Sequence, residues 1–404
     1  MVVGMRKLSE KEFTKSVLSS KSETPPRRGG SSTVQGWGSH NYIVMAVDRD
    51  GFIHLSGNMH ANQLTYFRSG KPGDVTTMEQ VDAMVGSKED RCTYPKFMNG
   101  HDGSLLFHYR DGGSGDGDEI YNVYDEKTRK WRRFLDASLI AGQGKRNAYQ
   151  NGPKLGPDGW YHLLWVWRET PDAATTHDLS YARSRDLTHW ETASGKTLTL
   201  PITIDSKGTI IDPVPVRGGI INGCHKFDFD SKNRVVVTYH KHDKNGNTQA
   251  YAARCEDGKW IISQISDWKD RHVFQGRGSA PSTFGTSLKL GTIGKHGKGK
   301  LALSYSHWKE GSGLLVIDEQ TLAPVAVESQ SVKTSRIPRA LTKVTSDFEG
   351  MGVRWCEDSG SSPDSTSRYV LRWESLESHR DQAREEPLPE NQELVLYRIG
   401  RGSE

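Results

Sequence analysis

The chain has 404 residues, 42 of them glycine and 11 tryptophan, and carries a formal net charge of +4. This length can bury a large core, and a weak charge without a Lys/Arg block excludes an extended nucleic-acid-binding surface. The four cysteines form no CxxC pair and no apolar run reaches 18 residues, which excludes a disulfide scaffold, a zinc ribbon and a membrane span.

The chain begins with a stretch that we expect to be a polar lead-in, residues 1–35, ending in "SETPPRRGGSS". Its start, "MVVGMRKLSEKEF", lacks the apolar stretch of a secretory signal. The remainder, residues 36–404, is predicted to form a single domain.

A repeated unit begins at His40, where a strand-like run, a "DRDG" turn and a second run lead to His60. The unit recurs as "YPKFMNGHDGSLLFHYRDGG" from Tyr94 and as "NGPKLGPDGWYHLLWVWRET" from Asn151. Further copies are "CHKFDFDSKNRVVVTYHKHD" from Cys224, a weaker one ending at His307, and the C-terminal "SRYVLRWESL". Each copy has the pattern of a β-hairpin.

Outer strands that end at a tryptophan follow several of these hairpins, as in "YNVYDEKTRKW", "SYARSRDLTHW" and "AYAARCEDGKW". The second of these resembles the Asp-box turn, S-x-D-x-x-x-W. Copies begin roughly every 55 to 70 residues, which is typical of four-stranded blades. We therefore predict an all-β fold, a seven-bladed β-propeller of antiparallel four-stranded blades, with the final "ELVLYRIG" closing the first or the last blade.

The ends of the hairpins carry an unusual set of polar residues. In a propeller, the residue before an inner strand and the residue after its hairpin partner lie at the same rim, where loops carry function. This places the following residues around one mouth: His40, His60, Tyr94, Arg110, Asn151, Arg168, His225, His240 or His242, and His307. His54, His101 and His162 lie inside hairpins, and we assign them no role.

The chemistry of this set favours proton abstraction next to a carboxylate. It lacks the paired carboxylates of most glycosidases, and the chain has no nucleophile elbow and no P-loop. Arg110 can offset a uronate carboxylate, and a His or Tyr can take the C5 proton while another protonates the departing glycosidic oxygen. The predicted product is an unsaturated uronate formed by β-elimination.

At these residues the chain resembles the BNR-4-repeat polysaccharide lyases. The likeness rests on "SGNMHANQLTYFRS", "YPKF…LLFHYRDGGSG", "NAYQNGP…HLLWVWRET…THDLSYARSRDLTHW" and "YVLRWESL", and covers residues 36 to 400. These lyases are seven-bladed propellers that include ulvan lyases and an L-rhamnose-α-1,4-D-glucuronate lyase acting on gum arabic. The resemblance implies an enzyme of this class and, as its first choice of substrate, rhamnose-glucuronate caps.

The same resemblance implies roles for individual residues. His40 and Tyr94 would share the acid and base roles, and Arg110, helped by His60, would neutralise the uronate. Pro95 is expected to hold Tyr94 in an extended backbone. The residues expected to bind substrate are Tyr149, Asn151, Arg168, His225 and His240.

Metal content is left open by the sequence, and no cofactor is needed for the chemistry. Family members carry structural Ca2+ or Zn2+, and Cys224, Cys255, His225, His240 and His242 are the one dense His/Cys set of this chain. Strand alternation sets these side chains on different faces, so that substrate binding by His225 or His240 is favoured over a zinc cage.

The expected partner is an acidic polysaccharide or its rhamnose-glucuronate termini, with no nucleic acid and no membrane, bound by a monomer. A secreted or periplasmic location follows from this substrate. Three alternatives remain: an endo-acting ulvan lyase, an α-L-rhamnosidase that hydrolyses the same linkage, and a non-catalytic glycan-binding propeller.

Overall fold

The computed structural model of the chain describes residues 1–20, 32–34, 38, 40–277, 286–329, 337–357, 366–377, 379, 383–390 and 392–400. Strands and short 3-10 turns (η1, Val75–Thr77; η2, Ala173–Thr175; η4, Arg339–Thr342) form its regular structure, so the prediction of an all-β protein is confirmed. No helix in these ranges is long and apolar enough to cross a membrane. The chain forms two compact units, one of Met1–Gly36 with His40–Ser329 and a smaller one containing Gln330–Glu404.

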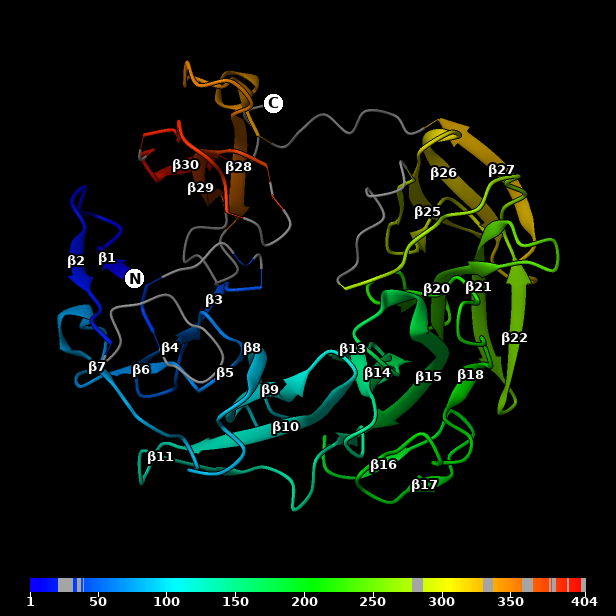
Figure 1. The fold of residues 1–404 in the computed structure, drawn as a ribbon, viewed down its shortest axis with the longest axis horizontal. Helices are drawn as coiled ribbons and strands as arrows, with labels where there is room; N and C mark the ends of the chain where they lie inside the picture. Colours follow the sequence, from blue (N-terminus) through cyan, green and yellow to red (C-terminus); the bar gives the residue numbers. More distant parts are fainter. Residues whose placement is uncertain are drawn as a thin grey trace. The chain divides into compact units, whose positions relative to one another are not determined.

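Five antiparallel sheets follow one another along the larger unit and fan out in chain order around a common centre (Figure 1). Sheet 1 contains β3 (Ile43–Val47), β4 (Ile53–Gly57), β6 (Tyr66–Ser69) and β7 (Met78–Gln80). Sheet 2 contains β5 (His60–Asn62), β8 (Cys92–Asn99), β9 (Leu105–Gly113), β10 (Asp116–Asp125), β11 (Lys130–Arg133) and β12 (Ile140–Ala141). Sheet 3 contains β13 (Asn147–Leu155), β14 (Tyr161–Arg168), β15 (Thr176–Ser184), β16 (Trp190–Glu191), β17 (Thr197–Leu198) and β18 (Ile210–Asp212).

Two further sheets complete the larger unit. Sheet 4 contains β19 (Lys226–Phe229), β20 (Val235–His242), β21 (Thr248–Glu256) and β22 (Lys259–Gln264). Sheet 5 contains β23 (Leu288–Leu290), β24 (Gly294–Lys295), β25 (Lys300–His307), β26 (Gly311–Asp318) and β27 (Pro324–Ser329). The smaller unit has one sheet of β28 (Gly352–Glu357), β29 (Ser367–Ser375) and β30 (Val395–Gly400).

Radially arranged antiparallel sheets of this kind are the blades of a β-propeller, but the prediction of seven blades was wrong. The described residues form six blade sheets of three to six strands, five in the larger unit and one in the smaller. Chain length and repeat spacing overestimated the number. The first strands add no blade, because β1 (Val2–Met5) and β2 (Thr14–Val17) form a two-stranded sheet of their own. The last strand adds none either, because β30 pairs with β29 in the sheet of the smaller unit.

The beginning of the chain packs against the first blade. Val3 and Leu18 are buried together with Ile53, Leu55 and Phe67 of sheet 1. The lead-in expected over residues 1–35 therefore contains a hairpin with an apolar side, which its polar composition did not indicate.

The turns of the hairpins are built on an aspartate. The Asp48 carboxylate accepts hydrogen bonds from the backbone N–H groups of Asp50 and Phe52, at 3.0 and 2.8 Å. In two sheets the aspartate also holds a buried histidine, which bonds a tyrosine through its other ring nitrogen. The two hydrogen-bonded triplets are Asp48–His54–Tyr66 and Asp158–His162–Tyr181. His54 and His162 thus link the turns of their own hairpins to a tyrosine of the next strand in the same sheet.

Apolar side chains fill the space between neighbouring blades. One buried cluster joins sheets 2 and 3 through Trp165, Trp167 and Trp190, which are at most 2% exposed. Trp190 ends the Asp-box segment, where its indole N–H donates to the Leu187 carbonyl at 2.9 Å. The faces of the sheets are thus held by large rings that pack from one blade into the next.

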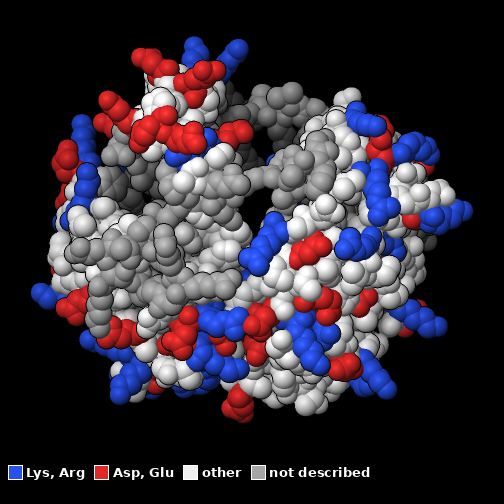
Figure 2. Space-filling model, in the orientation of Figure 1, with Lys and Arg blue, Asp and Glu red and all other residues white. Residues whose placement is uncertain are grey.

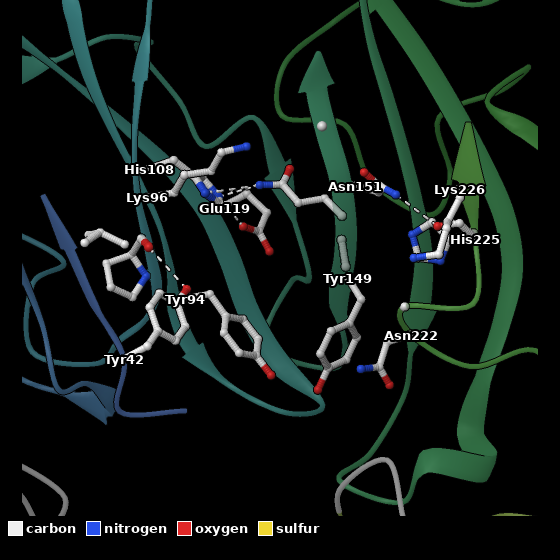
Figure 3. A pocket seen from close by; sticks show the side chains of 16 residues that line it. Tyr42, Tyr94, Lys96, His108, Glu119, Tyr149, Asn151, Asn222, His225 and Lys226 are labelled. Carbon is white, nitrogen blue, oxygen red and sulfur yellow. Dashed lines mark hydrogen bonds and ion pairs between the residues drawn. The ribbon is translucent and has the colours of Figure 1, made fainter. Parts of the chain in front are cut away.

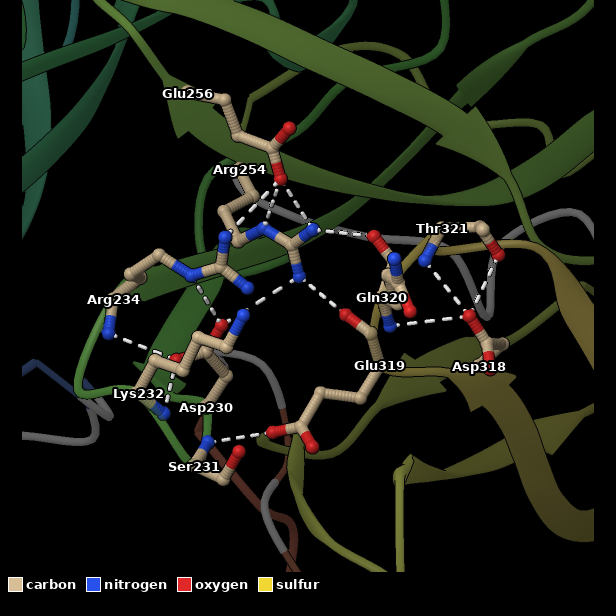
Figure 4. A network of polar contacts seen from close by, with 10 residues as sticks. All are labelled: Asp230, Ser231, Lys232, Arg234, Arg254, Glu256, Asp318, Glu319, Gln320 and Thr321. Carbon is tan, nitrogen blue, oxygen red and sulfur yellow. Dashed lines mark hydrogen bonds and ion pairs between the residues drawn. The ribbon is translucent and has the colours of Figure 1, made fainter.

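Most charged side chains lie on the surface, unlike the apolar side chains between the blades. Figure 2 shows basic and acidic side chains interspersed over the visible surface of the blades, without a broad field of one sign. One charged network is buried between sheets 4 and 5 (Figure 4). There Arg254, 1% exposed, lies 3.5 Å from the Asp230 carboxylate and donates to the backbone carbonyl of Gln320 at 2.7 Å.

This network yields a stability prediction. Arg254→Met removes one of two arginines beside the fully buried Asp230, which keeps Arg234 at 2.8 Å, and we expect the free energy of unfolding to fall by about 1.5 to 3 kcal/mol in a urea titration. The control, Lys269→Met, breaks an exposed pair with Asp267 and should leave the transition in place. Equal transitions for both variants would contradict this role of Arg254.

Candidate active site

Polar side chains from four successive sheets converge on one pocket, with a volume of about 560 Å3. The pocket is bordered by residues of β3, β8 and β13 and by the segment that leads into β19 (Figure 3). These are early strands of sheets 1 to 4. The pocket therefore lies where the blades of the larger unit approach their common centre.

His40 and His60 stack face to face, with ring centroids 4.1 Å apart and an interplanar angle of 15°. The register of β3 on β4 pairs Ile43 with Gly57, and its continuation sets position 40 opposite position 60. His60 itself belongs to the next blade, because it opens β5 and pairs with Thr93 of β8. The structure thus brings the two imidazoles together from two sheets, whereas the sequence indicated one hairpin.

Tyr94 lies beside these rings, 5.7 Å from His40 between ring centroids. The register of β8 shifts between Thr93 and Lys96, which leaves Tyr94 and Pro95 in a β-bulge. Tyr94 has φ of +57°, so the prediction of an extended backbone was wrong. A left-handed non-glycine residue costs about 1 to 3 kcal/mol, and such conformations gather at functional sites. The bulge overrides the local preference of a residue before proline.

Arg110 lies behind the tyrosines of the pocket and is 1% exposed. Its guanidinium carbon is 4.9 Å from the Tyr94 ring centre and 5.2 Å from that of Tyr149. Its Nε donates to the Gly112 carbonyl at 3.3 Å, while both terminal nitrogens are buried without a hydrogen-bond partner among the described residues. Unpaired buried donors are costly, so a ligand that offers acceptors would be favoured here.

Tyr149 connects Arg110 to a second buried guanidinium. The Arg168 guanidinium carbon lies 4.5 Å from the Tyr149 ring centre, and its Nη1 donates to the Tyr149 hydroxyl at 3.3 Å. The Tyr149 hydroxyl donates to Ser114 at 2.9 Å, and the other terminal nitrogen of Arg168 donates to Asn222. Ser114 and Asn222 were not predicted, because Ser114 lies in the turn between β9 and β10, Asn222 lies in the loop before β19, and neither stands at an end of an inner hairpin.

The two pocket tyrosines differ in acidity. Burial raises the pKa of the Tyr94 phenol to about 12. Burial also acts to raise the pKa of Tyr149, but the positive charges of Arg110 and Arg168 and the bond to Ser114 outweigh it and lower that pKa below its ordinary value. Tyr94 therefore keeps its proton at neutral pH, and Tyr149 releases its own more readily than a free phenol.

Asn151 and His225 meet on the far wall of the pocket, where the Asn151 side-chain N–H donates to the His225 carbonyl at 3.0 Å. His225 is 2% exposed, and both of its ring nitrogens lack a partner in the described part of the chain. Asn151 and Arg168, both expected at one mouth, do not lie opposite each other, because Asn151 pairs with Leu164. Arg168 pairs with Asn147, four positions earlier on β13.

His240 does not join the pocket. It is buried on β20, where its Nδ1 bonds the Gly219 carbonyl at 2.9 Å and its ring lies 5.6 Å from His272. Burial lowers the pKa of His240 to about 4. The register of β19 on β20 pairs Lys226 with Thr238, which sets His240 out of step with His225. His307 does not border the pocket either, and its ring stacks on that of Trp308 with the ring centroids 3.8 Å apart.

Two lysines of the pocket were missed by the sequence analysis. Lys96 and Lys226 both border it, and neither has an ion-pair partner in the described ranges. Burial lowers the pKa of Lys96. Lys96 follows Tyr94 by two positions, and strand alternation could have placed both on one face.

His108 and Glu119 also border the pocket and form a buried pair, with Nε2 and Oε2 2.7 Å apart. Glu119 is the one carboxylate among the residues that line the pocket. No three His, Cys, Asp or Glu side chains of the described residues lie together as ligands of a metal ion.

Comparison with known proteins shows the family of this chain. The family model described as "BNR repeat-containing family member" matches residues 1–268, which is more than half of the chain. The chain belongs to this family. Residues 40 to 240, which include all of the predicted site, fall within the matched part.

Relatives of this BNR repeat protein include ulvan lyases. An "Ulvan lyase, short isoform" from Alteromonas sp. (strain LOR) is 38% identical over 157 residues, covering 28% of this chain and 30% of the relative. An "Ulvan lyase, long isoform" from Glaciecola sp. (strain KUL10) is 48% identical over 135 residues, covering 24% of this chain and 13% of the relative. The chain thus matches less than a third of these proteins' own length.

Solved structures agree on the fold of the BNR repeat chain. The polysaccharide lyase Uly1 matches with a TM-score of 0.53 and 16% identity, over 90% of this chain and 78% of that one. A PL25 ulvan lyase matches with a TM-score of 0.51 and 13% identity, over 90% and 79%. At such identities the likeness supports the β-propeller alone.

The acidity of Tyr149 can be measured directly. Because two guanidinium groups favour its phenolate, we expect the first tyrosinate absorbance to appear at a lower pH than that of free tyrosine. Tyr149→Phe should remove this early phase. Tyr94→Phe is the matched control, since its phenol has a raised pKa and ionises late. An early phase that persists in Tyr149→Phe would refute the assignment.

Proposed function

We propose that this protein is a polysaccharide lyase that cleaves a rhamnose-α-1,4-glucuronate linkage by β-elimination, with gum arabic-type caps as the first candidate substrate. Family membership and the ulvan lyase relatives support the class of reaction. The observation that carries the proposal is Arg110, whose buried terminal nitrogens lack a partner among the described residues and whose guanidinium lies against the Tyr94 ring. On that same ring the stacked histidines approach, with His40 5.7 Å away between ring centroids.

The first requirement of the reaction is a more acidic C5–H. Its acidity is limited by the uronate's negative charge, and a guanidinium that binds the carboxylate bidentately removes this limit. Arg110 has two free donors for this purpose, and both Arg110 and His60 approach the Tyr94 ring, at 4.9 Å from its guanidinium carbon and at 6.5 Å between ring centroids. We assign the carboxylate to these two residues.

Proton transfer then needs one base and one acid. The base takes the C5 proton, the C5 electron pair forms the C4–C5 double bond, and the C4–O4 bond breaks as its oxygen is protonated. The high pKa of Tyr94 keeps its phenol protonated, which suits the acid, and His40, 5.7 Å away, suits the base. The opposite assignment applies if the C5 hydrogen points to the other face of the ring.

A hydrolytic alternative has weaker support. Most glycosidases use two carboxylates, whereas Glu119 is the one carboxylate that lines this pocket and it is paired with His108. A rhamnosidase that uses a histidine, or a non-catalytic binding propeller, would yield no unsaturated product. A polymeric substrate also implies a secreted or periplasmic protein, and we propose that it acts as a monomer.

The test is ultraviolet absorbance of the unsaturated uronate after incubation with gum arabic and with ulvan. We expect Tyr94→Phe to lower the rate about 10^2- to 10^4-fold by removing a proton-transfer group. Arg110→Ala should lower it about 10^2- to 10^3-fold by removing charge stabilisation. Arg49→Ala, an exposed arginine of a turn, is the control and should act like the wild type. No absorbance with either polymer would refute the lyase.

A sulfated substrate, as in an endo-acting ulvan lyase, is the second candidate. It is favoured by Lys96 and Lys226, which face the pocket without an ion-pair partner in the described ranges. One solved structure with this fold is a PL25 ulvan lyase bound to -[GlcA(1-4)Rha3S]-. A sulfate ester would supply the missing counter-charge for these lysines.

The two substrates are distinguished by the lysines. A lost charge-assisted bond costs about 1.5 to 3 kcal/mol, so Lys226→Gln and Lys96→Gln should each lower kcat/KM on ulvan about 10- to 100-fold. Both should leave kcat/KM on an unsulfated rhamnose-glucuronate substrate nearly unchanged. Lys154→Gln, whose lysine pairs with Asp228 outside the pocket, is the matched control. Equal losses on both substrates would contradict a sulfate-specific role.

A further inference from the structure

The hairpin turn between β9 and β10 reaches across from sheet 2 into sheet 3. Its register pairs Gly113 with Asp116, so Ser114 and Gly115 form the tip. The Gly115 N–H donates to the Asn147 side chain at 2.6 Å, and the Gly117 N–H donates to the Arg146 carbonyl at 3.0 Å. The tip is thereby docked on the beginning of β13, which carries Tyr149.

At this tip the Ser114 hydroxyl meets two groups of the candidate site. It accepts a hydrogen bond from the Tyr149 hydroxyl at 2.9 Å and one from Arg168 Nη1 at 3.4 Å. Arg168 Nη1 also donates to the Tyr149 hydroxyl at 3.3 Å. The three polar groups form a closed triangle, two corners of which come from sheet 3 and one from sheet 2.

The glycines around Ser114 leave room for this arrangement. A Cβ on Gly115, where φ is +82°, would lie 2.6 Å from the Thr170 backbone of the neighbouring blade. A Cβ on Gly117 would lie 2.8 Å from the Arg110 side chain. The turn therefore fits closely between the Thr170 backbone and the Arg110 side chain, which a bulkier turn would not allow.

From these contacts we infer that Ser114 is a positioning residue, which holds the Tyr149 hydroxyl and the Arg168 guanidinium in one arrangement across the boundary between sheets 2 and 3. Of these three groups only Tyr149 borders the pocket, so Ser114 and Arg168 act on the pocket through the Tyr149 hydroxyl. The inference rests on the proposed function in that Tyr149 is taken to face substrate. The "SGDG" turn, which contains Ser114, then both closes the β9–β10 hairpin and positions groups of the candidate site.

Removal of the hydroxyl has a defined consequence for Tyr149. The bond to Ser114 is one of the causes that lower the Tyr149 pKa, so its loss moves that pKa back toward the ordinary value. The Tyr149 hydroxyl also loses the acceptor that orients its O–H, while Arg168 Nη1 still donates to its oxygen. A purely structural serine would change neither property.

The experiment compares Ser114→Ala, Ser114→Thr and Ser231→Ala, the last being an exposed serine in another hairpin turn. Ser114→Ala should move the earliest tyrosinate phase to higher pH and lower kcat on the cleaved polymer about 3- to 10-fold with little change in KM. Ser114→Thr should restore both, because it keeps the hydroxyl. Ser231→Ala should behave as the wild type.

Separate outcomes decide the inference and the proposed function. An unchanged tyrosinate phase and unchanged kinetics in a folded Ser114→Ala protein would overturn the positioning role. If Ser114→Ala does not fold, Gly115→Ala provides the second variant, since it displaces the tip and must shift the same phase if the role is correct. A wild type without unsaturated product would overturn the lyase, while the tyrosinate titration would still test Ser114.

Discussion

Two buried guanidinium groups that both lie against one tyrosine ring are the constraint on which the candidate site depends. Arg110 and Arg168 lie 5.2 and 4.5 Å from the Tyr149 ring centre, and each is 1% exposed. Burial and the neighbouring charge of Arg110 lower the pKa of Arg168. Cations held in this way are costly without a counter-ion, and the ring faces offset only part of the cost. The pocket is therefore prepared for an anionic ligand group.

The propeller keeps these groups in place by dividing them among blades. Arg110 comes from β9, Tyr149 from β13 and Arg168 from β14, so their distances depend on how sheet 2 packs on sheet 3. The packing is fixed by the large rings of the shared core, among them Trp165 and Trp167. Side chains at a rigid blade boundary lose little entropy when a ligand binds, which is an advantage for catalysis. The strained backbone of Tyr94 is tolerated for the same reason.

Much of this arrangement follows from local patterns that the sequence displays. Alternating apolar residues, Asp/Gly turns and a tryptophan at the end of an outer strand are signals within one blade, and hairpin register already sets His40 opposite His60. The predicted neighbours of a residue were wrong where the strand register differed by one residue from a regular hairpin. A bulge at Tyr94 set Thr93 and not Tyr94 opposite Arg110, and one step of register separated His240 from His225.

The sequence by itself determined the all-β class, the blade hairpins and the residue types at their ends, because each depends on contacts within about twenty residues. Tertiary structure alone decided the number of blades, the passage of His60 into the second sheet and the approach of Ser114 to Tyr149. It also decided which lysines face the pocket. These features depend on bulges and on packing between blades, where residues distant in the chain exclude one another's volume and no local pattern records the result.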